Sequence, residues 1–164
     1  MRMRFKNITV LHRFFKNERG GTIAELAILV PFLAVMLAAV TEIGRFFQSY
    51  TTVSKSTRTA ARYLSNHAYT VGEQDKAKNL VVCGKLTACA QSERFVKNLT
   101  AANVCIETTG NPVETVTVRI PRSGNGCGAP VMYAPIFDIG ALLHNSFSMN
   151  FPIAPGTTMW HREP

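Results

Sequence analysis

The sequence predicts an α+β fold in which a long N-terminal helix, half of it in a membrane, packs on a small antiparallel sheet with one or two short helices. Three observations predict it. An apolar run of 23 residues lies near the N-terminus, a stretch without glycine or proline follows it, and short alternating runs occupy the second half. The 164 residues leave room for one compact domain of roughly 100–150 residues beyond the apolar run.

Composition and charge favour a membrane-attached domain. Hydrophobic residues make up 46% of the chain and charged residues 17%, below the usual figure of about 25%. This balance argues against disorder. Residues 1–20 hold six basic groups and one acid, so they carry +5 of the net charge of +8. Basic residues directly before an apolar run are typical of positive-inside topology. No zinc-finger spacing and no aromatic-and-basic RNA motif is present, so we expect no nucleic-acid partner.

The apolar run, Thr22–Gly44, would measure about 34 Å as a helix, enough to cross a hydrocarbon layer of about 30 Å. Glu25 and Glu42 lie near its ends and leave 16 uncharged residues between Leu26 and Thr41. That length is short for a span and a little long for a signal-peptide core. Three interpretations remain: a cleaved secretory signal, a simple membrane anchor, and an anchor whose leader is removed on the cytoplasmic side.

The residues at the start of the run favour the third interpretation. A basic leader ends in Gly20, Gly21 follows it, and Glu25 lies a few residues later, as in the type IV prepilin cleavage motif. Cleavage between the glycines would place Glu25 fifth in the mature chain and expose a positive amine one helical turn from it. Each charge alone is costly in lipid, and pairing offsets part of that cost. A simpler interpretation, which does not exclude this one, is that the helix dipole favours Glu25.

The sequence over Arg19–Leu33, followed by Thr41–Phe47 and Ala60–Leu64, resembles the TadE-like family of minor pilins or pseudopilins of the tight-adherence (Flp) type IV pilus system. TadF-like proteins share this plan. Leu26 stands where an aromatic residue often follows the motif glutamate. The resemblance implies processing by a prepilin peptidase, an inner-membrane anchor, and assembly with other pilins and with the inner-membrane assembly platform. About 120 residues follow the anchor, which favours a minor component over the main pilin.

The helix is expected to continue beyond the membrane. No glycine or proline occurs between Arg45 and His67, so one helix should extend from Thr22 to about Leu64. Pro31 lies inside it and should kink or loosen it. Apolar or small residues repeat at helical spacing along the second half: Phe46, Tyr50, Val53, Ala60, Ala61 and Leu64. We expect this stripe to dock on the chain's own C-terminal domain, with a partner helix as the alternative.

The second half of the sequence predicts short helices and strands. Glu73–Val82 reads as a helix that Gly84 terminates. Alternating apolar residues predict an antiparallel pair of strands at 102–108 and 116–120. Three further features complete the prediction: a helix at 135–144, a third strand at 147–151, and a loose tail at 155–164.

The four cysteines, Cys83, Cys89, Cys105 and Cys127, all follow the apolar run, and their even number predicts two disulfides. Three pairings exist. We favour Cys83–Cys89 with Cys105–Cys127, because each closes a loop between neighbouring elements. A zinc site is the alternative, but such sites usually have ligand pairs two to four residues apart.

No catalytic motif, cofactor motif or metal-binding motif occurs, so we expect no enzymatic activity. The expected layout is a cytoplasmic leader at 1–20, a transmembrane segment at 21–44, a periplasmic domain at 45–154 and the tail. We therefore expect a single-pass inner-membrane protein that contacts the lipid bilayer and acts by assembling with other pilus proteins. Whether it enters the pilus is left open. Two alternatives remain: an anchored periplasmic binding or scaffold module with an unprocessed N-terminus, and a released, disulfide-stabilised secreted protein.

Overall fold

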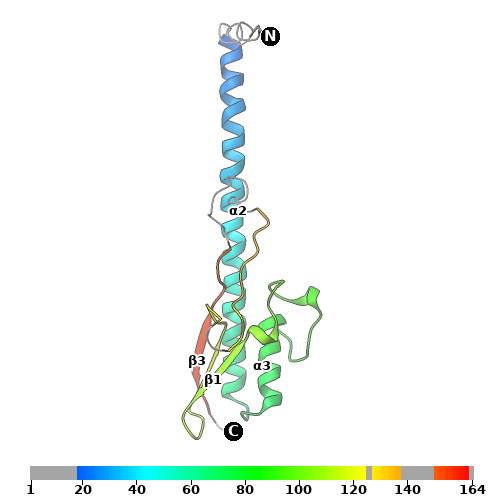
Figure 1. The fold of residues 1–164 in the computed structure, drawn as a ribbon, viewed down its shortest axis with the longest axis vertical. Helices are drawn as coiled ribbons and strands as arrows, with labels where there is room; N and C mark the ends of the chain where they lie inside the picture. The colour runs from blue at the N-terminus through cyan, green and yellow to red at the C-terminus, as the bar shows by residue number, and fades with distance from the viewer. Residues whose placement is uncertain (1–17, 125–126, 138–149, 163–164) are drawn as a thin grey trace, which may run out of the picture. The chain divides into compact units, whose positions relative to one another are not determined.

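The structure is a computed structural model that describes residues 18–124, 127–137 and 150–162. The chain divides into two compact units, residues 1–41 and 42–164. We call the described part of residues 42–164 the head. A long helix, a shorter helix and a three-stranded antiparallel sheet confirm the predicted α+β class (Figure 1).

The long helix α2 spans Glu18–Ser65 and therefore contains the whole of the predicted helix. Its later part holds no glycine or proline after Gly44, which explains why the helix continues without interruption. At its C-terminus, the Asn66 side chain donates to the Arg62 carbonyl at 3.0 Å. This bond satisfies one of the carbonyls that a helix end leaves without a partner.

The second helix, α3, spans Val71–Cys83, close to the predicted range. Its N-cap is Thr70, whose hydroxyl accepts a hydrogen bond from the Glu73 amide at 3.4 Å. Its C-cap is Gly84, which has φ +73° and donates its amide to the Leu80 carbonyl. A residue with a side chain would be strained in this left-handed conformation, so glycine ends the helix here. In Figure 1, α3 runs beside the last turns of α2.

The sheet has the order β1-β2-β3, with β1 at Cys105–Thr109, β2 at Thr115–Arg119 and β3 at Gly156–Trp160. Both pairs are antiparallel. The first two strands confirm the predicted pair. The expectation of a loose tail from residue 155 was wrong, because β3 lies there and pairs along all five residues with β2. Two adjacent threonines and a tryptophan give this segment the composition that strands favour.

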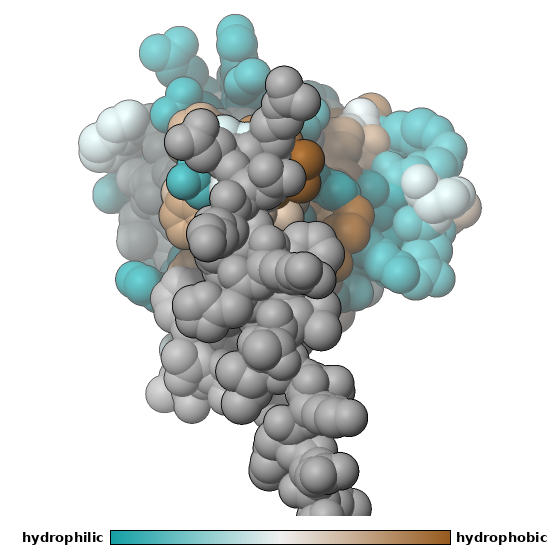
Figure 2. Space-filling view, turned by 90° about the horizontal axis from the view of Figure 1, so that it is seen from above, coloured by the Kyte–Doolittle hydropathy of each residue, from teal (hydrophilic) through white to brown (hydrophobic). Residues whose placement is uncertain are grey.

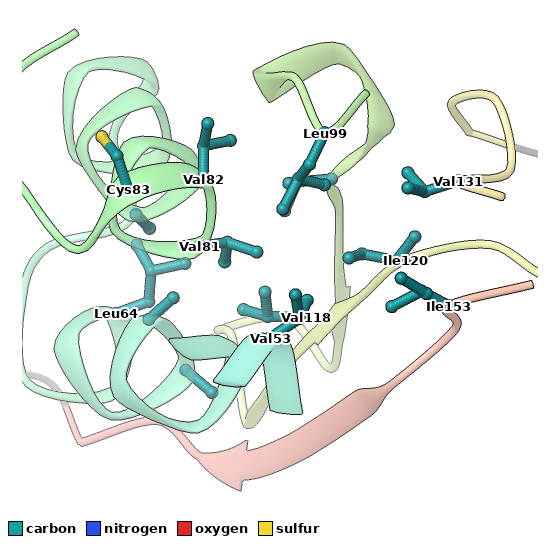
Figure 3. Packing of buried hydrophobic residues seen from close by; sticks show 14 of the residues in the cluster. Val53, Leu64, Val81, Val82, Cys83, Leu99, Val118, Ile120, Val131 and Ile153 are labelled. Atoms are coloured by element: carbon teal, nitrogen blue, oxygen red, sulfur yellow. The ribbon is translucent and has the colours of Figure 1, made fainter. Parts of the chain in front are cut away.

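The core of the head joins both helices to the sheet. Figure 3 shows Val53 and Leu64 of α2 directed toward Val81 of α3 and Val118 of β2. The predicted docking of the α2 stripe on the C-terminal half is thus confirmed, and four of its residues are fully buried: Val53, Ala60, Ala61 and Leu64. Among the described residues visible in Figure 2, hydrophilic ones (teal) lie mostly at the periphery and hydrophobic ones (brown) nearer the middle.

Two predicted elements differ or lie outside the described residues. The predicted third strand reached Phe151, but Asn150 and Phe151 are not in a strand, and 147–149 lie outside the described residues. Residues 151–153 instead run antiparallel to 131–133 through a single bridge between Met132 and Pro152. Of the predicted helix at 135–144, residues 135–137 are irregular and the remainder lies outside the described part of the chain. Pro152, a member of this bridge, has no amide hydrogen to donate, so a regular ladder does not continue through it.

Candidate functional site

The first candidate site is the N-terminal part of α2, which leaves its apolar side chains uncovered. Ten large hydrophobic residues between Ile23 and Val40 keep between 48% and 77% of their surface exposed, and Val35 is half-buried. Within the described residues, α2 is the one helix that is long and apolar enough to span a membrane, a test that a signal sequence also passes. So much exposed apolar surface is unfavourable in water, so lipid or other apolar helices must cover it.

The predicted processing site lies in the first turns of this helix. Gly20 and Gly21 both belong to α2, and the space around Gly21 would admit a side chain without contact. Each glycine lowers helix stability by about 1 kcal/mol relative to alanine, so this end of the helix opens more readily than the rest. Glu25 is exposed and lies one turn further along. The cleavage site and the charge pairing therefore remain predictions.

Pro31 is also inside α2. Because proline has no amide hydrogen, the carbonyl of Ala27, four residues earlier, lacks its usual helical donor. Near the end of the apolar segment, Thr41 directs its hydroxyl inward and donates to the Leu37 carbonyl at 2.7 Å. The helix itself thereby satisfies the hydroxyl of this exposed side chain. The kink expected at Pro31 stays a prediction.

The second candidate site surrounds Glu42, the first residue of the head. Its carboxylate is buried, with only 3% of the residue exposed. The Tyr133 hydroxyl donates to Glu42 Oε1 at 2.5 Å, and the Ile136 amide donates to the same oxygen at 3.1 Å. These bonds tie α2 to a segment more than 90 residues later. A buried carboxylate without such donors would be strongly destabilising.

Aromatic rings surround this carboxylate. Phe46 packs edge-on against Tyr133 with ring centroids 5.4 Å apart, and its ring lies 5.6 Å from Phe151 and 6.3 Å from Tyr50. Pairs at these separations attract each other beyond the area they bury. The rings line an open pocket of about 510 Å³. Among the residues that the structure describes, the lining is Glu42, Ile43, Phe46, Tyr50, Arg122, Tyr133, Phe151, Pro152 and Ala154.

The setting of Tyr133 fixes its protonation. Burial, and then the hydrogen bond to Glu42, raise the pKa of Tyr133 to about 12. Tyr133 therefore remains a hydroxyl donor throughout the physiological pH range. Sequence reasoning used Glu42 as the end of the apolar run and as part of the family resemblance, and it missed Tyr133 and Arg122. The four-residue spacing of Glu42, Phe46 and Tyr50 was the available signal, since it places all three on one helix face.

A polar cluster joins the end of α2 to the start of α3. The Tyr63 hydroxyl and the Lys76 ammonium both donate to Glu73, the latter at 2.8 Å. The hydrogen bond from Lys76, followed by that from Tyr63, lowers the pKa of Glu73 below its usual range. The His67 ring stacks on Tyr63. These contacts connect the end of α2 to the first turn of α3.

The cysteines form two disulfides, Cys83–Cys89 and Cys105–Cys127, which is the pairing that the sequence favoured. The first closes the loop after α3, and the second joins β1 to a loop beyond β2. Among the described residues, no three histidine, cysteine, aspartate or glutamate side chains are grouped closely enough to hold a metal ion. Each disulfide joins two segments of the head and so acts as a cross-link within it.

Comparison with protein-family models gives a match to the family described as TadE-like protein, over residues 20–62. No curated protein and no solved structure matches the chain. The matched segment contains Gly20, Gly21, Glu25, Pro31, Glu42 and the pocket-lining aromatic residues of α2. The TadE-like family is a structural, non-enzymatic group, and it suggests involvement in the Tad pilus system together with other pilus components and the membrane.

Proposed function

Because residues 20–62 are TadE-like, we propose that this chain is a membrane-anchored minor pilin or pseudopilin that acts in assembly of a Tad (Flp) type IV pilus. The observation that carries the proposal is the coincidence of the family match with an uncovered apolar helix. The apolar part of α2 anchors the chain in the inner membrane with its N-terminus in the cytoplasm. The head lies in the periplasm, where oxidising conditions maintain its disulfides.

A prepilin peptidase cleaves the chain between Gly20 and Gly21 in this proposal. The weak helical preference of two adjacent glycines supports it, because a protease needs the backbone locally extended. The released amine of Gly21 lies about 6 Å along the helix axis from Glu25. The exposed carboxylate of Glu25 is then available to balance this amine, either in the same chain or in a neighbouring pilin.

Assembly follows from the need to cover the apolar helix. When the protein leaves the bilayer for a filament, its exposed side chains must pack against the helices of other pilins and minor pilins, because water cannot accommodate them. The head contributes a separate, disulfide-stabilised surface that contacts the assembly platform or neighbouring subunits. The helix therefore carries the association, and the head determines which partners take part.

The charge pairing is tested by pilus counts in cells that lack the chromosomal gene and express a variant. Glu25→Ala should be processed but should yield few pili, because an unpaired amine remains in the apolar layer. Glu25→Asp should retain part of the assembly. Glu114→Ala, which removes an exposed acid of the head, is the matched control and should assemble normally. Normal pilus numbers with Glu25→Ala would refute the charge pairing.

A second candidate function is an anchored periplasmic binding or scaffold module that keeps its N-terminus. Two observations favour it: the pocket beside Glu42, and the position of the Gly20–Gly21 bond within α2. In that case the chain would remain in the membrane at full length and cells lacking it would still form pili.

A further inference from the structure

We propose that the aromatic pocket beside Glu42 binds the headgroup of a zwitterionic phospholipid with a primary ammonium, of the phosphatidylethanolamine type. The inference rests on the proposed membrane anchoring of α2. The pocket volume of about 510 Å³ lies within the range of roughly 300–1,000 Å³ that small-molecule sites occupy. It suits a lipid headgroup together with the first part of its acyl chains.

The pocket presents two opposite charges among apolar walls. Arg122 is exposed at one part of the lining, and its guanidinium is suited to a phosphodiester because it offers several donors in a fixed plane. Glu42 gives another part of the wall a carboxylate whose Oε1 is already bonded by Tyr133 and Ile136. A ligand with both a phosphate and an ammonium therefore complements the pocket.

The rings supply a second feature that favours an ammonium. Phe46, Tyr50, Tyr133 and Phe151 all line the pocket, and Tyr50 and Phe151 keep 36% and 40% of their surface exposed. Aromatic faces attract cations, and a primary ammonium, unlike a quaternary one, can also donate hydrogen bonds to a carboxylate. An anionic headgroup would gain from Arg122 and from Arg45, which lies near Glu42, but it would meet repulsion from the Glu42 carboxylate that lines the pocket itself. The zwitterionic class is therefore favoured over the anionic class.

The place of the pocket in the chain identifies a lipid, rather than a free phosphate ester, as the ligand. Glu42 and Ile43 directly follow the apolar segment that ends at Thr41, so they lie on the turn of α2 that leaves the hydrocarbon layer in the proposed topology. Tyrosine, with an apolar ring and a polar tip, is enriched at this level of a membrane protein. Phe46 and Phe151 offer apolar surface that acyl chains can cover.

The test uses the full-length chain in detergent micelles and native mass spectrometry, with phosphatidylethanolamine, phosphatidylglycerol and phosphatidylcholine of identical acyl chains. We expect one phosphatidylethanolamine to be retained per chain, with phosphatidylglycerol and phosphatidylcholine retained less. Arg122→Gln should weaken that retention by about tenfold, which corresponds to about 1.4 kcal/mol. Arg58→Gln, which removes an exposed guanidinium of α2 that does not line the pocket, is the matched control and should bind as the unaltered chain does.

Equal retention of the three lipids, or equal binding by the unaltered chain and Arg122→Gln, would overturn the proposal. Preferential retention of phosphatidylglycerol would also overturn it, because Glu42 would then not select the headgroup. Circular dichroism of Arg122→Gln establishes that the exposed substitution leaves the fold intact. A chain that still fractionates with membranes and supports pili but shows no lipid preference would refute this inference alone, whereas recovery of the chain from the soluble fraction would refute the anchoring.

Discussion

The hydrogen bond between Tyr133 and Glu42 joins the start of the head to its C-terminal half, so its removal should destabilise the head measurably. Tyr133→Phe removes only the hydroxyl and keeps the ring that packs against Phe46. Both partners are buried, with 6% of Tyr133 and 3% of Glu42 exposed. A hydrogen bond to a charged group contributes about 1.5–3 kcal/mol. We therefore expect the folded-to-unfolded ratio to fall by about 10- to 150-fold.

The assay is urea unfolding of the full-length chain in a mild detergent, followed by near-ultraviolet circular dichroism of the aromatic residues of the head. Tyr69→Phe is the matched control, because Tyr69 packs partly against the same core but its hydroxyl has no hydrogen bond among the described residues. The control should change the free energy of unfolding by less than about 0.5 kcal/mol. If Tyr133→Phe changed it as little as the control does, the bond to Glu42 would not stabilise the head and the reasoning would be refuted.

Two further predictions concern the cross-links and the polar cluster of the helices. Replacing Cys105 and Cys127 by serine should lower the free energy of unfolding by about 3 kcal/mol, and replacing Cys83 and Cys89 should lower it by about 2 kcal/mol. The Cys105–Cys127 bridge has the larger effect because its sequence separation is 22, against 6 for Cys83–Cys89, and it therefore closes the longer loop. Urea unfolding without reductant measures both losses, and the reverse order would contradict the loop argument. Glu73 has a lowered pKa when folded, so its stabilisation is present above pH about 4.5 and is lost as the pH falls further. Glu73→Gln should therefore flatten the pH dependence of stability in that range, and an unchanged acid profile would show that the ion cluster contributes nothing.

Local sequence signals predicted much of the fold. The absence of glycine and proline after Gly44 sufficed for the long helix, and Gly84 marked the end of α3. Val116 and Val118, two residues apart, identified both the strand and its buried face. In each case the information lies within a few neighbouring residues, where backbone preference and side-chain spacing act directly.

The parts that sequence reasoning missed depend on distant residues. The segment at 156–160 has no alternation of apolar and polar residues, and it becomes a strand because β2 offers it a free edge. The Glu42–Tyr133 bond likewise joins residues 91 positions apart. An acid at the end of an apolar run has several explanations from the sequence alone, and only the folded head distinguishes a buried, hydrogen-bonded carboxylate from an exposed one. Long-range pairing of this kind leaves no periodic trace in the chain.

The intact mass of the chain, purified from the membranes of cells that form pili, tests the central claim most directly. We expect a mature protein that begins at Gly21 and has lost the basic leader, and we expect Gly20→Leu to accumulate at full length in the same membranes. A chain that still begins at Met1 in piliated cells would contradict the account, because the amine that Glu25 is proposed to balance would never form.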